Sequence, residues 1–232
     1  GRCGTSRQRV QVQWQILRLT EKTGGDAYGA TARSVEERLK TLFPQLTKSS
    51  QPTVVWFQDL EDEKVITRID GSIFQNENIG LTMKRFNCYK VDIHGIPDGD
   101  IKKKYMKQAG FHFFDPKGDA IGKPLTGKRS TSLSGFSSAI ERVWTKVFTM
   151  KLKAYQKLMK HVLDGFDKVD SKKQVRDKQL ERLAKKPNPA KKAQIEKELA
   201  VLDEAKKKVE EEEKGVFEEC TLRPDYVADA KD

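Results

Sequence analysis

The stretch Gly110-Phe111-His112-Phe113-Phe114-Asp115-Pro116-Lys117-Gly118-Asp119 indicates how the sequence around it folds. Phe111 and Phe113 alternate with other residues, as the side chains of a half-buried strand do. Asp-Pro-Lys-Gly predicts a tight turn, because proline fixes one φ and glycine accepts a left-handed conformation. We therefore expect a β-hairpin whose return strand covers residues 120–123.

Two further apolar runs predict the centre of a sheet. Residues 53–57 and 88–93 are rich in β-branched and aromatic side chains, which is typical of strands buried on both faces. A helical region separates the two runs, so the strands are expected to be parallel, unlike those of the hairpin. Amphipathic helices are expected over residues 34–46, 100–108 and 136–147. Together these elements predict an α/β fold with a mixed sheet flanked by helices.

The C-terminal part of the chain has a different pattern. Apolar residues at helical spacing run from Leu152 into the 180s and again from Ile195 to Val209. Pro187-Asn188-Pro189 lies between the two stripes, and proline cannot continue a helix. The pattern predicts an antiparallel helical hairpin, or coiled coil. Because its apolar seam is thin, a protein partner or self-association through this hairpin is expected.

Composition limits the class of protein. The 232 residues are 36% hydrophobic and 34% charged, and the net charge is +11. We interpret most of this charge as a solvated cationic face; nucleic-acid binding through the basic arm is a weaker alternative. No apolar run approaches the roughly 20 residues that span a bilayer. A soluble protein is expected, either cytoplasmic or exported after removal of a leader.

Residues 52–148 resemble a thioredoxin-like domain. The motifs that carry the resemblance are Val54-Val55-Trp56-Phe57, an F-x-x-x-K-V-D strand from Phe86 to Asp92, and the F-x-F-F-D-P-x-G hairpin. The resemblance divides the chain into an N-terminal arm with an amphipathic helix (1–50), a thioredoxin-like domain (51–148), a helical hairpin (149–217) and a tail (218–232).

The sequence departs from this family at the residues that carry its chemistry. Redox-active members have C-x-x-C at the start of the helix after the first strand, where the helix dipole lowers a thiol pKa. Residues 58–78 contain no cysteine. The family also places a cis-proline immediately before the third strand, and Ala109 and Gly110 stand near that position here. The resemblance thus implies a redox-inactive domain, and we predict no catalytic residues and no cofactor.

The remaining cysteines and histidines do not form a recognisable site. Cys88 is expected to be a buried core residue, and a Cys3–Cys220 disulfide stays open. His94 near Asp92 is a possible metal pair, but two residues do not make a site, so no metal is predicted. His112 is expected to be packed or hydrogen-bonded, on the opposite face of the sheet from Phe111.

The favoured hypothesis is a non-catalytic thioredoxin-like module that binds proteins or takes part in assembly. Its partner-binding surface is predicted where redox relatives hold substrate, near Phe74, Asn76, Ala109 and Gly110. The alternative is a thiol-dependent redox enzyme or sensor that uses a lone cysteine, Cys88 or Cys220.

Overall fold

The computed structural model describes residues 2, 4–17, 40, 43–46, 49–185 and 187–227. Their contacts divide the chain into two compact units. The helical unit consists of Gly1–Gln11 and Met150–Thr221, and the sheet unit consists of Val12–Thr149 and Leu222–Asp232. The expected helix over residues 34–46 lies largely outside the described residues; its last described turn is η3 (Pro44–Leu46).

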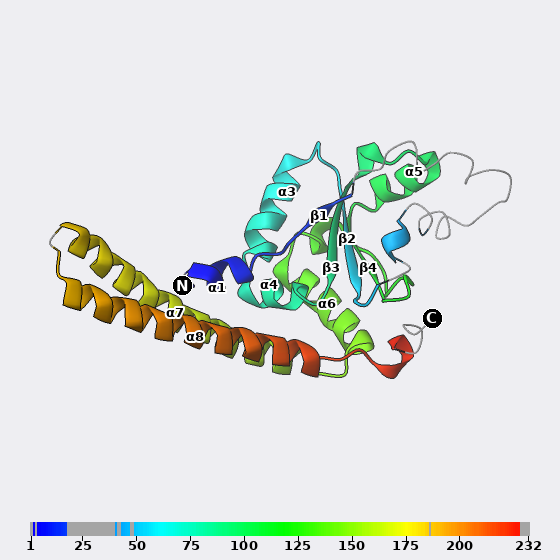
Figure 1. Cartoon of the computed structure of the whole chain (residues 1–232). Coiled ribbons are helices and arrows are strands. Elements are labelled where there is room, and N and C mark those ends of the chain that lie inside the picture. Colours follow the sequence, from blue (N-terminus) through cyan, green and yellow to red (C-terminus); the bar gives the residue numbers. More distant parts are fainter. Residues whose placement is uncertain are drawn as a thin grey trace. The chain divides into compact units, whose positions relative to one another are not determined.

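The sheet unit is built on a five-stranded mixed sheet with the strand order β1-β3-β2-β4-β5 (Figure 1). β2 pairs in parallel with β3 and antiparallel with β4, so that Val54 lies between Cys88 and Phe113. The prediction of an α/β fold with a mixed sheet is confirmed. The strands are β1 (Gln15–Ile16), β2 (Thr53–Gln58), β3 (Asn87–Asp92), β4 (Gly110–Phe114) and β5 (Leu125–Thr126).

The helices of the sheet unit start where side chains cap their free backbone N–H groups. Asp98 accepts hydrogen bonds from two N–H groups at the start of α5, and Ser132 accepts one at the start of α6. The helices and helical turns are α3 (Glu63–Ile69), η4 (Asp70–Phe74), α4 (Glu77–Met83), η5 (Ile93–Gly95), α5 (Gly99–Lys107), η6 (Gly127–Arg129), α6 (Leu133–Val147) and η7 (Pro224–Tyr226).

Both faces of the sheet are covered. On one face Phe111 packs edge-on against Phe136 of α6, with 4.7 Å between the ring centroids. On the other, Phe57 stacks on Tyr105 of α5 at 3.7 Å. All residues of β2 and β4 are buried as a result, which explains why their sequences are apolar throughout rather than alternating.

The turn after β4 forms as predicted, but the return strand does not. Gly118 adopts φ +81°, and its N–H donates to the carbonyl oxygen of Asp115 at 2.9 Å. The expected strand over residues 120–123 is wrong: a single bridge joins Phe114 to Ala120, and pairing resumes only at β5. Gly122 at φ +70° bends the chain away from the ladder, and Pro124 has no N–H to donate.

The helical unit is a helical hairpin joined by a short N-terminal helix, α1 (Gly4–Arg9). The hairpin consists of α7 (Leu152–Lys185) and α8 (Pro189–Glu219), which pack along each other (Figure 1). Asn188 accepts a hydrogen bond from the N–H of Lys191 at 3.0 Å, and proline occupies the first helical position. The predicted hairpin is confirmed. Among the described helices, none combines the length and the apolar character needed to cross a membrane.

Candidate functional site

The segment between β2 and α3 holds carboxylates at the place where the family resemblance leads one to look for thiols. Asp59 accepts a hydrogen bond from the N–H of Glu61 at 3.1 Å, which closes a tight turn after the strand. Asp62 then caps α3 by accepting from the N–H of Val65 at 3.2 Å. These two carboxylates therefore stabilise the connection between the strand and the helix. The connection itself contains no cysteine.

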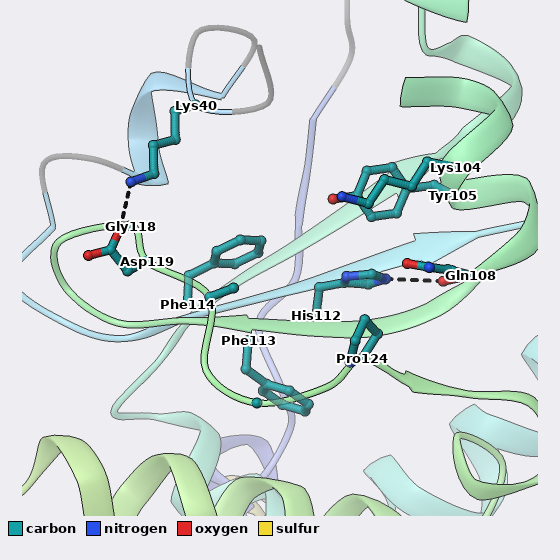
Figure 2. Close-up of a pocket in the computed structure, with 12 residues that line it drawn as sticks. Lys40, Lys104, Tyr105, Gln108, His112, Phe113, Phe114, Gly118, Asp119 and Pro124 are labelled. Carbon is teal, nitrogen blue, oxygen red and sulfur yellow. Dashed lines mark hydrogen bonds and ion pairs between the residues drawn. The ribbon is translucent and has the colours of Figure 1, made fainter. Parts of the chain in front are cut away.

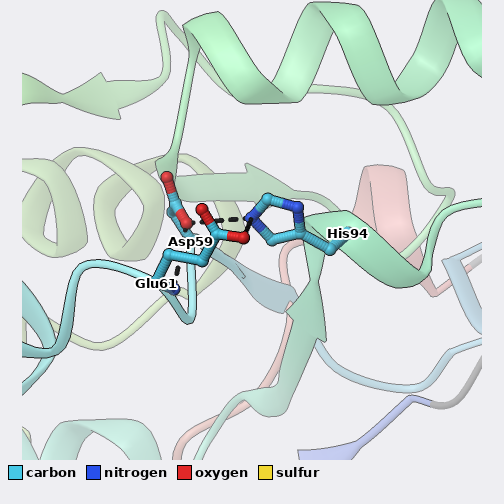
Figure 3. Close-up of side chains that lie close together, drawn as sticks. All are labelled: Asp59, Glu61 and His94. Carbon is cyan, nitrogen blue, oxygen red and sulfur yellow. Dashed lines mark hydrogen bonds and ion pairs between the residues drawn. The ribbon is translucent and has the colours of Figure 1, made fainter.

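A histidine from the neighbouring strand end faces this turn (Figure 3). The Nε2 atom of His94 lies 3.0 Å from Oδ1 of Asp59 and 3.9 Å from Oε1 of Glu61. The two groups meet because β2 and β3 are parallel, so that their carboxyl ends lie at the same edge of the sheet. The side chain of Asp92 instead accepts from the backbone N–H of His94 at 3.0 Å and so caps η5.

The electrostatics of this cluster favour its charged forms. The hydrogen bond from His94 lowers the pKa of the Asp59 carboxyl, and the same bond raises the pKa of His94. Sequence reasoning considered Asp92 as the partner of His94 and missed Asp59. A usable signal exists: Asp59 and His94 directly follow two strands that were predicted to be parallel neighbours.

The cluster matches a metal-ligand set in type. Ligand atoms of Asp59, Glu61 and His94 all lie within 4.8 Å of one another, and zinc accepts such nitrogen and oxygen ligands. However, Asp59 and His94 already satisfy each other, and 83% of the Glu61 side chain is exposed. We assign no ion to the cluster.

A cavity of about 390 Å³ opens on the α5 side of β4 (Figure 2). His112 forms part of its wall, and its Nε2–H donates to the carbonyl oxygen of Gln108 at 3.0 Å. The imidazole also packs edge-on against Tyr105 and Phe57, at 4.7 Å and 5.0 Å between centroids. Burial lowers the pKa of His112 to about 4, so the cavity presents a neutral imidazole at neutral pH.

One ion pair lies at the same cavity. The Nζ atom of Lys40 is 2.6 Å from Oδ1 of Asp119, the residue that follows the turn glycine.

The prediction that His112 is packed and hydrogen-bonded, on the face opposite Phe111, is confirmed. The cavity is large enough for a small ligand, and the hydrogen bond to Gln108 holds the imidazole of His112 in its wall.

The predicted partner-binding residues have clear structural roles. Phe74 packs against Trp14 and Trp56, with centroid distances of 5.1 Å and 5.4 Å, and is half-buried. Asn76 caps α4 by accepting from the N–H of Ile79 at 3.3 Å. Gly110 begins β4, and Ala109 packs against the core on the α5 side. Their role in binding stays a prediction.

The two described cysteines, Cys88 and Cys220, are both buried. Cys88 is 4% exposed in β3, and burial strongly raises the pKa of its thiol. Its prediction as a core residue is confirmed. Cys220 is fully buried after the end of α8, and Cys3 lies outside the described residues, so a Cys3–Cys220 disulfide stays a prediction. Every described peptide bond is trans, including the one before Gly110.

Comparison with known proteins identifies no relative: no family model, no curated protein and no solved structure matches this chain.

Proposed function

We propose that the sheet unit is a thioredoxin-like domain that binds protein partners without dithiol chemistry, and that the α7–α8 hairpin is an arm for docking or assembly. One observation carries the proposal: the segment between β2 and α3 holds Asp59, Glu61 and Asp62 and no cysteine. Dithiol exchange needs an attacking and a resolving sulfur. The buried Cys88 supplies neither.

The arrangement of the elements supports the thioredoxin-like part of the proposal. The parallel pair β2–β3, helix α5, the antiparallel pair β4–β5 and helix α6 occur in the order that the resemblance implies. The proposed binding surface includes Phe74, whose ring is held by Trp14 and Trp56. A half-buried aromatic group that is already fixed in place loses little entropy when a partner covers it.

A reductase assay tests the absence of dithiol chemistry. The intact chain is incubated with a disulfide-containing substrate protein and a thiol reductant, and reduction is followed over time. We expect the substrate protein to be reduced at the same rate as by the reductant alone. The matched control is the double variant Asp59→Cys with Asp62→Cys, which places C-x-x-C spacing at the same helix start and should exceed that rate. Reduction by the unaltered chain would overturn the proposal.

Exposed valines support the assembly role of the hairpin. Val175 of α7 is 52% exposed and Val201 of α8 is 69% exposed. They lie in the region where Lys173 pairs with Asp203 across the hairpin, so both belong to the same stretch of the arm. Light scattering across a concentration series should show self-association that the double variant Val175→Lys with Val201→Lys reduces. The control is Val227→Lys, an exposed valine in the sheet unit. A chain that stays monomeric at all concentrations would remove self-association from the proposal.

A further inference from the structure

Helix α1 of the N-terminal segment lies along the hairpin (Figure 1). Polar side chains of this segment contact a row of carboxylates. Nη1 of Arg2 lies 2.9 Å from Oδ2 of Asp167 and also bonds to Asp164. The backbone N–H and the hydroxyl of Thr5 both donate to Oδ2 of Asp170, at 2.7 Å and 2.8 Å. The segment therefore contacts α7 over two of its turns.

The second half of α1 continues the same pattern. The hydroxyl of Ser6 donates to Oδ1 of Asp167, and Ser6 is fully buried. Arg9 bonds to Glu213 of α8 and lies 3.6 Å from Glu210, while its guanidinium carbon sits 3.9 Å from the ring centroid of Phe166. We call the five carboxylates contacted here the acidic face: Asp164, Asp167, Asp170, Glu210 and Glu213.

The spacing of the contacting residues is that of one helix face. Thr5, Ser6 and Arg9 lie within α1 at the spacing of one helix face, and Arg2, which precedes the helix, contacts the same row of carboxylates. Arg7 falls outside this set and is exposed. The acceptors Asp164, Asp167 and Asp170 are themselves three residues apart on α7. The donor side chains of the N-terminal segment therefore lie along the row of acceptor carboxylates on α7.

The energetics indicate that α1 owes its shape to this contact. Its six residues are too few for a stable isolated helix, which needs roughly 12–15 residues even in favourable sequences. The side chain of Glu213 is only 9% exposed, and Arg2 and Arg9 are 17% and 25% exposed. Partly buried, charge-assisted hydrogen bonds of this kind are stronger than neutral ones. The acidic face thus selects a helical, arginine-bearing segment.

We propose that the acidic face is a docking site for short segments of partner proteins that carry one arginine in a short helix and a second arginine seven residues before it, with hydroxyl side chains between them. The segment 2–9 is its resident occupant, which such a partner displaces. The inference rests on the proposed role of the hairpin as a docking arm and names the chemistry of the partner. A hollow of about 480 Å³ lies beside Thr5 and Gln8 of α1, and Asp170, Lys173, Asp177 and Lys206 contribute to its lining.

The test uses the full chain with a protease site inserted between Gln11 and Val12. After cleavage, a fluorescent peptide with the sequence of residues 1–11, in which Cys3→Ser removes the thiol, is added at 0.15 M salt, about physiological ionic strength. We expect saturable binding by anisotropy, or retention of the original peptide through gel filtration. The uncleaved chain, whose own segment competes at high effective concentration, should bind the peptide at least about tenfold more weakly.

Peptide variants separate specific docking from general attraction between charges. Arg9→Ala should weaken binding about tenfold or more, whereas Arg7→Ala, which removes the same charge from an exposed position, should weaken it less than about threefold. Absence of both binding and retention, or equal losses for the two variants, would overturn the inference. A chain that reduces disulfides yet binds the peptide would instead overturn only the proposed redox-inactive function.

Discussion

His112 should make the stability of the sheet unit fall in mild acid. Its neutral imidazole is buried between Phe57 and Tyr105 and donates one hydrogen bond to Gln108. Protonation would place a positive charge on the other ring nitrogen, among apolar groups and close enough to Lys104 for repulsion. The charged form is therefore disfavoured in the folded state, whereas in the unfolded chain water solvates it.

The size of the effect follows from the pKa in the two states. Folding lowers the pKa of His112 from 6.5 to about 4, so its contribution to stability is complete above pH 6.5 and is lost as the pH falls towards 4. Relative to pH 7.5, linkage predicts a loss of about 1.4 kcal/mol at pH 5.5 and about 2.5 kcal/mol at pH 4.5. The variant His112→Phe cannot titrate and should lack this part of the pH dependence.

The assay is urea denaturation at pH 4.5, 5.5, 6.5 and 7.5, followed by tryptophan fluorescence. All three tryptophans, Trp14, Trp56 and Trp144, belong to the sheet unit, so the signal reports that unit alone. The difference between the free energies of unfolding of the two proteins cancels groups that titrate equally in both. His112→Leu serves as a second non-titrating variant. Parallel pH profiles for the unaltered chain and both variants would refute the reasoning.

Three further experiments probe the sheet unit. Gly110→Ala should destabilise it by about 3 kcal/mol in the same denaturation assay, because φ is +140° and an added Cβ would lie 2.2 Å from a carbonyl oxygen. Gly99→Ala, with open space around the added Cβ, is the control and should change stability by less than about 1 kcal/mol. His94 should titrate above pH 6.5 by NMR, and Asp59→Asn should lower its pKa, because the carboxylate stabilises the imidazolium. Cys88 should react with iodoacetamide only after denaturation, measured by mass spectrometry.

Each of these expectations has a contrary result. Equal stabilities of the two alanine variants would show that the strand start tolerates a side chain. A His94 pKa that Asp59→Asn leaves unchanged would mean that the ion pair does not form in solution. Rapid alkylation of Cys88 near neutral pH would reopen the lone-cysteine alternative.

The sequence predicted the parts of the fold whose signal is local. The apolar run of β2 predicts a buried strand, and the prolines on either side of Asn188 predict a break between two helices. Each prediction needs only the chemistry of a few neighbouring residues, and both features are observed. The return strand after Gly118 was misplaced because Gly122 bends the chain, and the sequence alone does not state the φ of a glycine.

The features that the sequence did not predict depend on distant partners. The contact between Asp59 and His94 joins residues 35 positions apart, and it forms because their two strands pair in parallel. Helix α1 has no apolar face, so no periodic signal marks it. It becomes helical where carboxylates more than 150 positions away accept its hydrogen bonds.

The docking of α1 on the hairpin has a consequence for the order of folding during synthesis. Arg9 is made 204 residues before its partner Glu213. At about 5–20 residues per second, a ribosome needs roughly 10–40 s to cover that distance. In that interval residues 12–149 are completed and can form their core, and until residues 164–170 follow, the arginine-bearing segment has no carboxylate row to occupy. The earliest piece of the helical unit therefore reaches its full set of contacts only after α8 has been made as far as Glu213.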